Sequence, residues 1–368
     1  MMKIGILTFH CAHNYGAVLQ CYATQEFLVS KGYEVEVINY RPECLIAPYK
    51  IFDINRILSK SLVKTLKSLL IELLVFYSRV RRFIGFEKFI ETRLNVGKEI
   101  TPSTLPADYD IYIVGSDQIW NPKITGGFDP VYFCDFPFSK GRKKYIAYAA
   151  SMESTGLTQV QKDFFKQNFK KFDAIGVREK DLLEQLQSLV PNRMNHVLDP
   201  TLMVPTNVWD NISSYKRESP KRVVVYQVRT NSNTMRIANH IAHQIGAKVY
   251  VLVASLQPIP SNRVNQTATP EEFVDVIRNA ACVVTTSFHG TAFSIIHNVA
   301  FYTIKLNDGA DSRSSSLLTS LELSDRIIEA DELPNFTEVN YIEVNKKLDI
   351  LRERSQDFLL TNIQNAIS

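Results

Sequence analysis

The sequence lacks the features of a membrane-spanning or nucleic-acid-binding protein. No stretch approaches the roughly 18 uncharged apolar residues that a spanning helix needs. The first apolar run, 3–8, is too short for a signal peptide and leads straight into His10 and Asn14, so we expect a strand there. A net charge of +4 without a dense basic block gives no reason to expect nucleic-acid binding.

Cysteine is scarce and scattered. The five cysteines form no CxxC pair and no zinc-type spacing, so we expect reduced thiols in a cytoplasmic protein. His10, Cys11 and His13 approach a metal-ligand spacing, but no carboxylate is fixed beside them. No metal site is therefore expected.

The chain also lacks a GxGxxG motif, although it opens as strand, glycine-bearing turn, helix and strand. At 368 residues it is long for one core, and two series of alternating strands and helices flank a proline-containing linker at 204–220. This pattern predicts an α/β protein with two Rossmann-like domains that face each other across a cleft. We place them at 1–204 and 205–338, followed by a C-terminal helix within 339–368.

Residues 42–106 differ in character and predict a helical insertion in the N-terminal domain. From Arg56 to Arg93, basic residues alternate with Ile, Leu, Val and Phe, and we expect two helices. Three interpretations are open: a hairpin packed on the sheet with a solvated basic face, an interfacial helix that contacts an anionic membrane through about 50–95, or a surface for a partner protein.

The stretch Val283–Ser294 is central to the functional interpretation. A short β-branched run breaks into hydroxyls, His289 and Gly290, and then continues as a predicted helix with Thr286 or Ser287 as its N-cap. A helix N-terminus presents free N–H groups and a positive dipole end, so an anion would bind there. His289 would supply that anion with a proton.

Other polar or charged residues also follow predicted strands or lie in loops, and the carboxyl ends of parallel strands meet at one edge. We therefore expect one cleft lined by residues of both domains: Asn14, Gly16, Ser116, Asp117, Gln118, Arg178, Ser287, His289 and Arg313. Simpler roles are open for some of them. Asp117 would be a helix cap, His289 a structural histidine, Arg178 with Glu179 a surface ion pair, and Arg313 part of a solvated loop at 307–316.

Five motifs together resemble the polysaccharide pyruvyl transferase family over about residues 1–330. They are the Asn14-Tyr15-Gly16 turn within Ile6–Gln20, Val114–Asn121, Val177-Arg178-Glu179, Leu198-Asp199-Pro200-Thr201 and Ser287–Thr291. The resemblance implies a fold similar to the two-domain GT-B glycosyltransferases. It also implies transfer of the enolpyruvyl skeleton of phosphoenolpyruvate to a sugar, which forms a pyruvate ketal and releases phosphate. Phosphoenolpyruvate is then a co-substrate, and no cofactor is expected.

The resemblance also implies residue roles. His289 would be the acid and Asp117 the base, while Arg178, Ser287, Gly290 and Arg313 would hold the donor. Asn14, Gly16, Ser116 and Gln118 would face the acceptor sugar, and Tyr15 and Trp120 would stack on it. Many members carry an arginine where this chain has Ser287, so Arg313, or else Arg229, would replace that charge.

The implied acceptor is a bacterial surface polysaccharide, such as a capsule or exopolysaccharide, or its lipid-linked precursor. The expected location is the cytoplasm or the cytoplasmic face of the membrane. Two other functions are open. One is a glycosyltransferase that uses a nucleotide sugar, with Glu271 or Glu272 on the ribose, although acids are common at such a helix start. The other is a non-catalytic protein that binds glycans or assembly partners.

Overall fold

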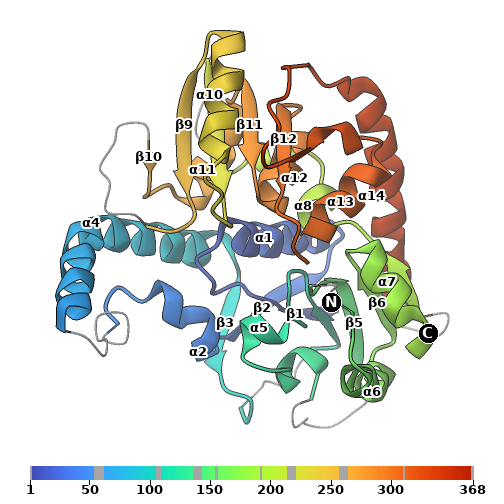
Figure 1. Cartoon of the computed structure of the whole chain (residues 1–368). Helices are drawn as coiled ribbons and strands as arrows, with labels where there is room; N and C mark the ends of the chain where they lie inside the picture. The colour runs from blue at the N-terminus through green and yellow to red at the C-terminus, as the bar shows by residue number, and fades with distance from the viewer. Residues whose placement is uncertain are drawn as a thin grey trace.

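The computed structural model describes residues 2–53, 62–104, 109–135, 143–153, 156–190, 193–213, 221–256, 264–309 and 311–365. Within these ranges the chain forms two parallel β-sheets covered by helices (Figure 1). The first sheet has the order β3-β2-β1-β4-β5-β6-β7 and the second the order β10-β9-β8-β11-β12-β13. The prediction of an α/β protein with two Rossmann-like domains is thus confirmed.

The strands of the first sheet are β1 (Lys3–Leu7), β2 (Glu34–Tyr40), β3 (Val96–Ile100), β4 (Ile111–Val114), β5 (Lys144–Ala150), β6 (Ala174–Val177) and β7 (Met194–His196). Those of the second are β8 (Arg222–Gln227), β9 (Lys248–Val253), β10 (Val264–Asn265), β11 (Cys282–Thr285), β12 (Ala300–Lys305) and β13 (Ile327–Glu329). The central strands β4, β6 and β11 are buried along their whole length, as expected for parallel strands covered on both faces.

The helices of the N-terminal half are α1 (Tyr15–Ser30), α2 (Glu43–Ile46), α4 (Leu62–Arg93), α5 (Pro122–Thr125), α6 (Gln159–Asn168), α7 (Lys180–Leu186), α8 (Pro200–Met203) and α9 (Asn207–Asp210). Those that follow are α10 (Thr234–Ile245), α11 (Pro270–Arg278), α12 (Phe288–Ile296), α13 (Asp311–Ser320) and α14 (Tyr341–Gln364). Short 3-10 turns include η1 (Ala47–Tyr49).

Local capping chemistry explains why several helices begin and end where the sequence predicts. Ser287 caps α12, since its Oγ accepts from the Gly290 N–H. Thr269 caps α11 through a reciprocal capping box with Glu272, and Pro270 takes the first helical position. Gly246 ends α10 in the left-handed conformation, which glycine adopts without a steric penalty.

The structure corrects the predictions for two segments. Residues 307–316 were expected to form a loop, but α13 begins at Asp311, where the aspartate carboxylate accepts from the N–H groups of Leu306 and Asp308. Within the predicted linker 204–220, α9 buries Trp209 completely, so this part is packed and not a free linker. Residues 214–220 lie outside the described ranges.

The insertion contains one long helix where the sequence pattern predicts two. Helix α4 runs without interruption from Leu62 to Arg93, and residues 54–61, which include the start of the predicted helical region at Arg56, lie outside the described part of the chain. Its inner turns bury Phe86, Phe89 and Ile90 in the core. Among the described residues, no helix is both long and apolar enough to cross a membrane.

The two domains share one continuous apolar core. It contains Val18 and Ile113 of the first domain together with Val283 and Phe293 of the second. Helix α14 then returns from the second domain to the first (Figure 1), since the Tyr341 hydroxyl donates to the Val299 carbonyl at one end and the Leu198 N–H donates to Ser355 Oγ farther along. Both features hold the domains in one relative position.

Trp209 provides a test of this shared core. Its ring lies 6.1 Å from that of Tyr22 in the first domain and 4.8 Å from that of Phe293 in the second. Trp209→Ala would leave a cavity between the domains and should lower the free energy of unfolding by about 3–5 kcal/mol. Val160→Ala, at a surface position, should change it by less than about 0.5 kcal/mol. Urea unfolding followed by circular dichroism measures both, and a loss below about 1 kcal/mol for Trp209→Ala would contradict the shared core.

Candidate active site

The candidate active site lies at the topological switch points of the two sheets. In each sheet the chain order reverses between two central strands, β1 and β4 in the first and β8 and β11 in the second. Open α/β sheets bind ligands at the carboxyl ends of such strands. The segments that follow these four strands line one pocket of about 230 Å³, in which Asn14, Asp117, Arg229 and His289 each represent one segment.

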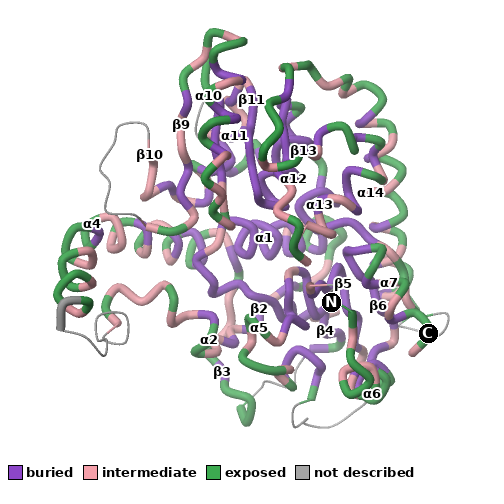
Figure 2. The backbone as a smooth tube through the Cα atoms, viewed as in Figure 1, coloured by how far each residue is buried: buried purple, intermediate pink, exposed green. Residues whose placement is uncertain are grey.

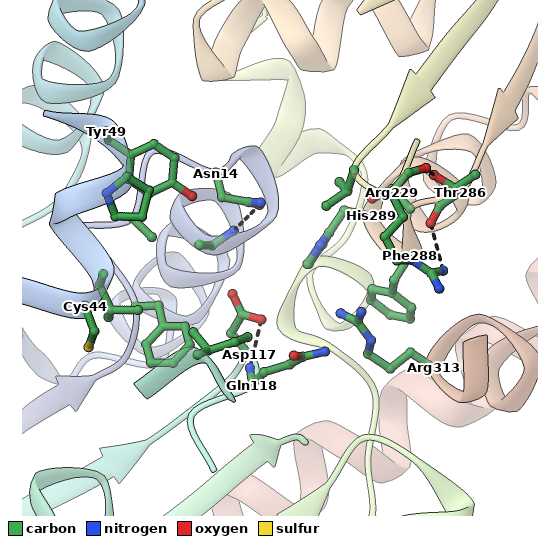
Figure 3. A pocket seen from close by; sticks show the side chains of 18 residues that line it. Asn14, Cys44, Tyr49, Asp117, Gln118, Arg229, Thr286, Phe288, His289 and Arg313 are labelled. Atoms are coloured by element: carbon green, nitrogen blue, oxygen red, sulfur yellow. Dashed lines mark hydrogen bonds between the residues drawn. The ribbon is translucent and has the colours of Figure 1, made fainter. Parts of the chain in front are cut away.

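The pocket has two walls that belong to different domains (Figure 3). Asn14, Asp117 and Gln118 come from the first domain, joined by Cys44 and Tyr49 of the insertion. The opposite wall consists of residues from the segments after β8 and β11 and from α12 and α13: Val228, Arg229, Thr286, Ser287, Phe288, His289 and Arg313. The sequence therefore predicts the two-sided cleft, and the structure adds the insertion as part of its lining.

His289 links the two walls. It lies in the first turn of α12, and its side chain reaches across to the first domain, where Nε2 is 3.7 Å from Asp199 Oδ2. The imidazole is largely buried, and within the described residues Nε2 makes no hydrogen bond. It is not a structural histidine bonded to a backbone carbonyl. His289 is also one of the residues that line the pocket, which makes its imidazole a candidate for proton exchange with a bound molecule.

Gly16 makes room for this imidazole. It lies in the first turn of α1, and a Cβ atom added there would be only 1.9 Å from His289 Nδ1. No side chain fits at that distance. The predicted role of Gly16 at the acceptor is therefore not what its position indicates, since this glycine instead allows the catalytic candidate of the other domain to approach.

A network of buried charges lies behind His289. The Arg178 guanidinium donates from Nη1 to Asp199 Oδ2 at 2.6 Å and from Nε to Glu179 Oε1 at 3.3 Å. All three side chains are almost completely buried. Arg178 also lies over the Phe288 ring, with 4.8 Å between the guanidinium carbon and the ring centroid. The simpler interpretation of Arg178 and Glu179 as a surface ion pair is therefore wrong.

The network fixes the charge state of Asp199. Burial alone would raise the pKa of this carboxyl group, but the adjacent His289, Arg178 and Thr201 outweigh burial and hold the pKa below its usual range. By contrast, burial raises the pKa of Glu179. Asp199 is thus a constant negative charge next to the His289 imidazole. Arg178 lies behind the pocket and is not among the residues that line it, so its position does not indicate direct contact with a molecule bound there.

Arg313 supplies a positive charge at the pocket surface. It comes from the first turn of α13, and no carboxylate among the described residues forms an ion pair with it. Burial, and then the charge of Arg178, lower the pKa of Arg313 to about 10. With its amide oxygen turned toward the guanidinium, Gln118 accepts from Arg313 Nη2 at 3.0 Å. Arg313 is therefore a cation without an opposing charge of its own, which is what an anion site requires.

Arg229, the second candidate for the missing charge, is already neutralised. Its guanidinium pairs with Asp308 and, at 2.9 Å, with Asp311, and it also donates to the Thr286 carbonyl. It lines the pocket, but its positive charge is neutralised by the carboxylates of α13 and the preceding loop. The structure therefore favours Arg313 over Arg229 for the role that the sequence left to either of them.

Asp117 and Asn14 lie on the opposite wall. Asp117 adopts a left-handed conformation, with φ of 72°, which directs it out of the strand end. Its Oδ1 accepts from the Gln118 N–H at 2.8 Å and is 4.0 Å from Arg178 Nη2. Asn14 caps α1 through Oδ1. Neither carboxylate oxygen of Asp117 caps a helix, so the capping alternative for this residue is wrong.

Four predicted site residues have structural roles. Tyr15 is fully buried between the domains, donates to the Ala268 carbonyl and stacks on Phe273. Trp120 is fully buried and donates to the Tyr132 carbonyl. Neither residue is among those that line the pocket.

The other two are Ser116 and Gly290. Ser116 is buried, and its hydroxyl contacts the Ala149 carbonyl and Asp199. The Gly290 N–H already donates to Ser287 Oγ, and an added Cβ would be 2.3 Å from Thr285 Oγ1. Gly290 therefore permits close packing of α12 on β11, and it is not a free phosphate donor.

Several residues in or behind the pocket were not predicted from the sequence. Asp199 and Glu179 belong to two of the motifs, but the sequence assigned no functional role to either of them, although an aspartate just before a proline is a recognisable helix-cap signal. Phe288 and Tyr49 give no sequence signal beyond their aromatic character. Neither Glu271 nor Glu272 lines the pocket, because Glu271 lies 3.7 Å from Arg93 and Glu272 belongs to the capping box of α11.

Comparisons with solved structures return proteins of low sequence identity. A putative UDP-N-acetylglucosamine 2-epimerase from Listeria monocytogenes has a TM-score of 0.46 and 11% identity, with 97% of this chain and 90% of that chain covered. UGT89C1 of Arabidopsis thaliana complexed with UDP has a TM-score of 0.44 and 11% identity, with 100% and 94% covered. No curated protein matches the chain.

The comparison with protein families is decisive. The family model described as polysaccharide pyruvyl transferase matches residues 14–308, which include the Asn14 turn, Asp117, Arg178, Asp199 and His289. This match spans most of the chain and includes residues of both walls of the pocket, although Arg313 lies beyond its end. The chain belongs to the polysaccharide pyruvyl transferase family and is a transferase that acts in polysaccharide biosynthesis.

Proposed function

We propose that this enzyme transfers the enolpyruvyl group of phosphoenolpyruvate to a sugar of a surface polysaccharide or its lipid-linked precursor. The observation that carries the proposal is the pocket lining, in which the His289 side chain lies together with the cation Arg313 and the carboxylate Asp117. A donor with a phosphate and a carboxylate needs cations, and its chemistry needs both an acid and a base.

The reaction replaces two sugar O–H bonds with two C–O bonds at C2 of the donor. Protonation of C3 makes C2 electrophilic, and a sugar hydroxyl adds to C2. The C2–O bond to phosphate then breaks, and a second hydroxyl closes the ketal. Of the two hydroxyl protons, one is balanced by the proton gained at C3 and the other leaves on hydrogen phosphate.

In this scheme His289 protonates C3. Asp199, held ionised 3.7 Å from Nε2, stabilises the imidazolium before transfer and fixes the orientation of the ring. Arg178 and Thr201 hold Asp199 in place. The acid therefore belongs to the second domain, whereas the groups that support it belong to the first.

Arg313 and the N-terminus of α12 bind the donor. Arg313 offers several N–H donors in a planar fork that matches phosphate or carboxylate. The first turn of α12 adds the positive end of the helix dipole beside it. Together they replace the arginine that many family members carry at the position of Ser287.

Asp117 acts as the base for the sugar hydroxyl. It lines the pocket from the first domain and faces the donor wall, with Asn14 and Gln118 beside it to hydrogen-bond the acceptor (Figure 3). Gln118 contacts Arg313 as well, so it lies between the donor and acceptor parts of the pocket.

His289→Ala should reduce turnover by about a hundredfold or more, because the general acid is lost. The measurement is phosphate release from phosphoenolpyruvate in the presence of an oligosaccharide acceptor, with mass spectrometry of the product for the ketal. His243→Ala, on the surface of α10, serves as the control and should behave as wild type. Near-normal turnover of His289→Ala would exclude this role.

Arg313→Gln should raise the KM for phosphoenolpyruvate by about tenfold or more, since a charge-assisted hydrogen bond to the donor disappears. Arg229→Gln should have a smaller effect, because that guanidinium is already paired with Asp308 and Asp311. Steady-state kinetics with varied donor compares the two variants. Equal effects, or a larger effect at Arg229, would place the donor elsewhere.

Gly16→Ala should reduce turnover strongly while the protein stays folded, because the new methyl group takes the space of the His289 imidazole. We expect a loss in kcat of about a hundredfold, comparable with removal of the acid itself. Turnover and thermal unfolding are measured on the same preparation. Wild-type turnover in a folded Gly16→Ala variant would show that the position of the ring does not matter.

A further inference from the structure

The outer turns of α4 carry a cluster of exposed apolar side chains. Leu73 is 66% exposed and Tyr77 68% exposed, on a helix that extends away from both domains (Figure 1). The cluster, called here the α4 apolar stripe, consists of Leu66, Leu69, Leu70, Leu73, Leu74, Phe76 and Tyr77. Figure 2 shows much of this outer part of the helix as exposed. Apolar side chains gathered in this way usually mark an interaction surface.

The stripe occupies one side of the helix. Successive residues of an α-helix are rotated by about 100°, so residues spaced three, four and seven apart share a face. Leu66, Leu70, Leu73 and Tyr77 follow this spacing, while Val75 on the opposite side is buried. The helix thus has a second apolar side that no described element of the chain covers.

The charges beside the stripe are positive. Lys64, Lys67 and Arg81 are exposed, and Arg81 lies over the Tyr77 ring. The acid in this part of the helix, Glu72, is bonded to Arg79 Nη2 at 3.0 Å. An apolar face with basic residues at its border suits the interface of an anionic bilayer.

The inner turns of the same helix lie next to the candidate active site. Its inner turns place Arg79, Arg82 and Phe83 in the lining of a second pocket, of about 350 Å³. This pocket shares Asn14, Pro48, Tyr49 and Val228 with the catalytic pocket, and its described lining contains no carboxylate. A molecule with an anionic group near a membrane could therefore extend from α4 to the catalytic residues.

We propose that the α4 apolar stripe docks the enzyme on an anionic membrane surface, and that an acceptor carrying a lipid-linked phosphate reaches the catalytic pocket through the second pocket. The docking part stands on the stripe and its charges, whereas the part about the acceptor rests on the proposed function. A second copy of the chain is a poorer occupant, because pairing two stripes would bring the exposed Lys64, Lys67 and Arg81 of both copies together, while Glu72 is already bonded to Arg79.

The test is sedimentation of the whole protein with vesicles of phosphatidylcholine alone or mixed with phosphatidylglycerol. Wild type should bind the mixed vesicles, and binding should weaken at high salt. The double variant Leu70→Glu/Leu73→Glu should bind them at least about tenfold less. The control, Val160→Glu/Ile342→Glu, adds the same charge at apolar positions that are 79% and 71% exposed on other helices, and it should bind as wild type.

Three results would overturn the docking: no wild-type binding to mixed vesicles, equal loss in the control, or a wild-type dimer that dissociates in the Leu70→Glu/Leu73→Glu variant without any vesicle binding. Phosphate release with a water-soluble oligosaccharide acceptor tests the proposed reaction separately from membrane docking. Vesicle binding needs no substrate, so it can be observed even if the donor is not phosphoenolpyruvate. Conversely, turnover on the soluble acceptor should be unchanged in the stripe variant even if docking fails.

Discussion

The relative position of the two domains at the pocket depends on one buried carboxylate, that of Asp199. It accepts from Arg178, Ser116 and Thr201, and it lies next to His289 of the other domain. A charge taken out of water is stable only when its partners surround it, and removing one partner of such a pair typically costs about 3–5 kcal/mol. The segments that supply these partners must therefore keep their positions relative to one another. The same holds for the two domains. The position of the catalytic candidate follows from this electrostatic requirement.

The sequence was sufficient to predict the fold and a pocket shared by both domains. Alternating strands and helices predicted both domains, and polar residues after β1, β4, β8 and β11 predicted a shared cleft. These inferences succeed because they rest on local periodicity and on a general property of parallel sheets. The cap residues Ser287 and Thr269 were predictable for the same reason, since capping involves only neighbouring residues.

The side-chain roles were less predictable because they depend on contacts between distant segments. Tyr15 and Trp120 follow strands as a binding residue would, yet both rings fill the core. Arg178 and Arg313 look alike in sequence. One lies behind the pocket among acids and the other at its surface without an ion-pair partner in the described chain. The distinction between Arg229 and Arg313 likewise requires the contacts with Asp308 and Asp311, which no spacing rule contains.

The close approach of Gly16 and His289 has a consequence for domain exchange. Each residue belongs to a different domain, and the room for the imidazole exists only because its neighbour has no side chain. A chimera that joins one half of this chain to half of a relative would inherit a matched pair only if both parents use the same two residues. Although each sheet has its own helices, the two domains must therefore be exchanged together in such a chimera. A change of substrate range is better sought by altering the insertion and the loops than by exchanging one domain.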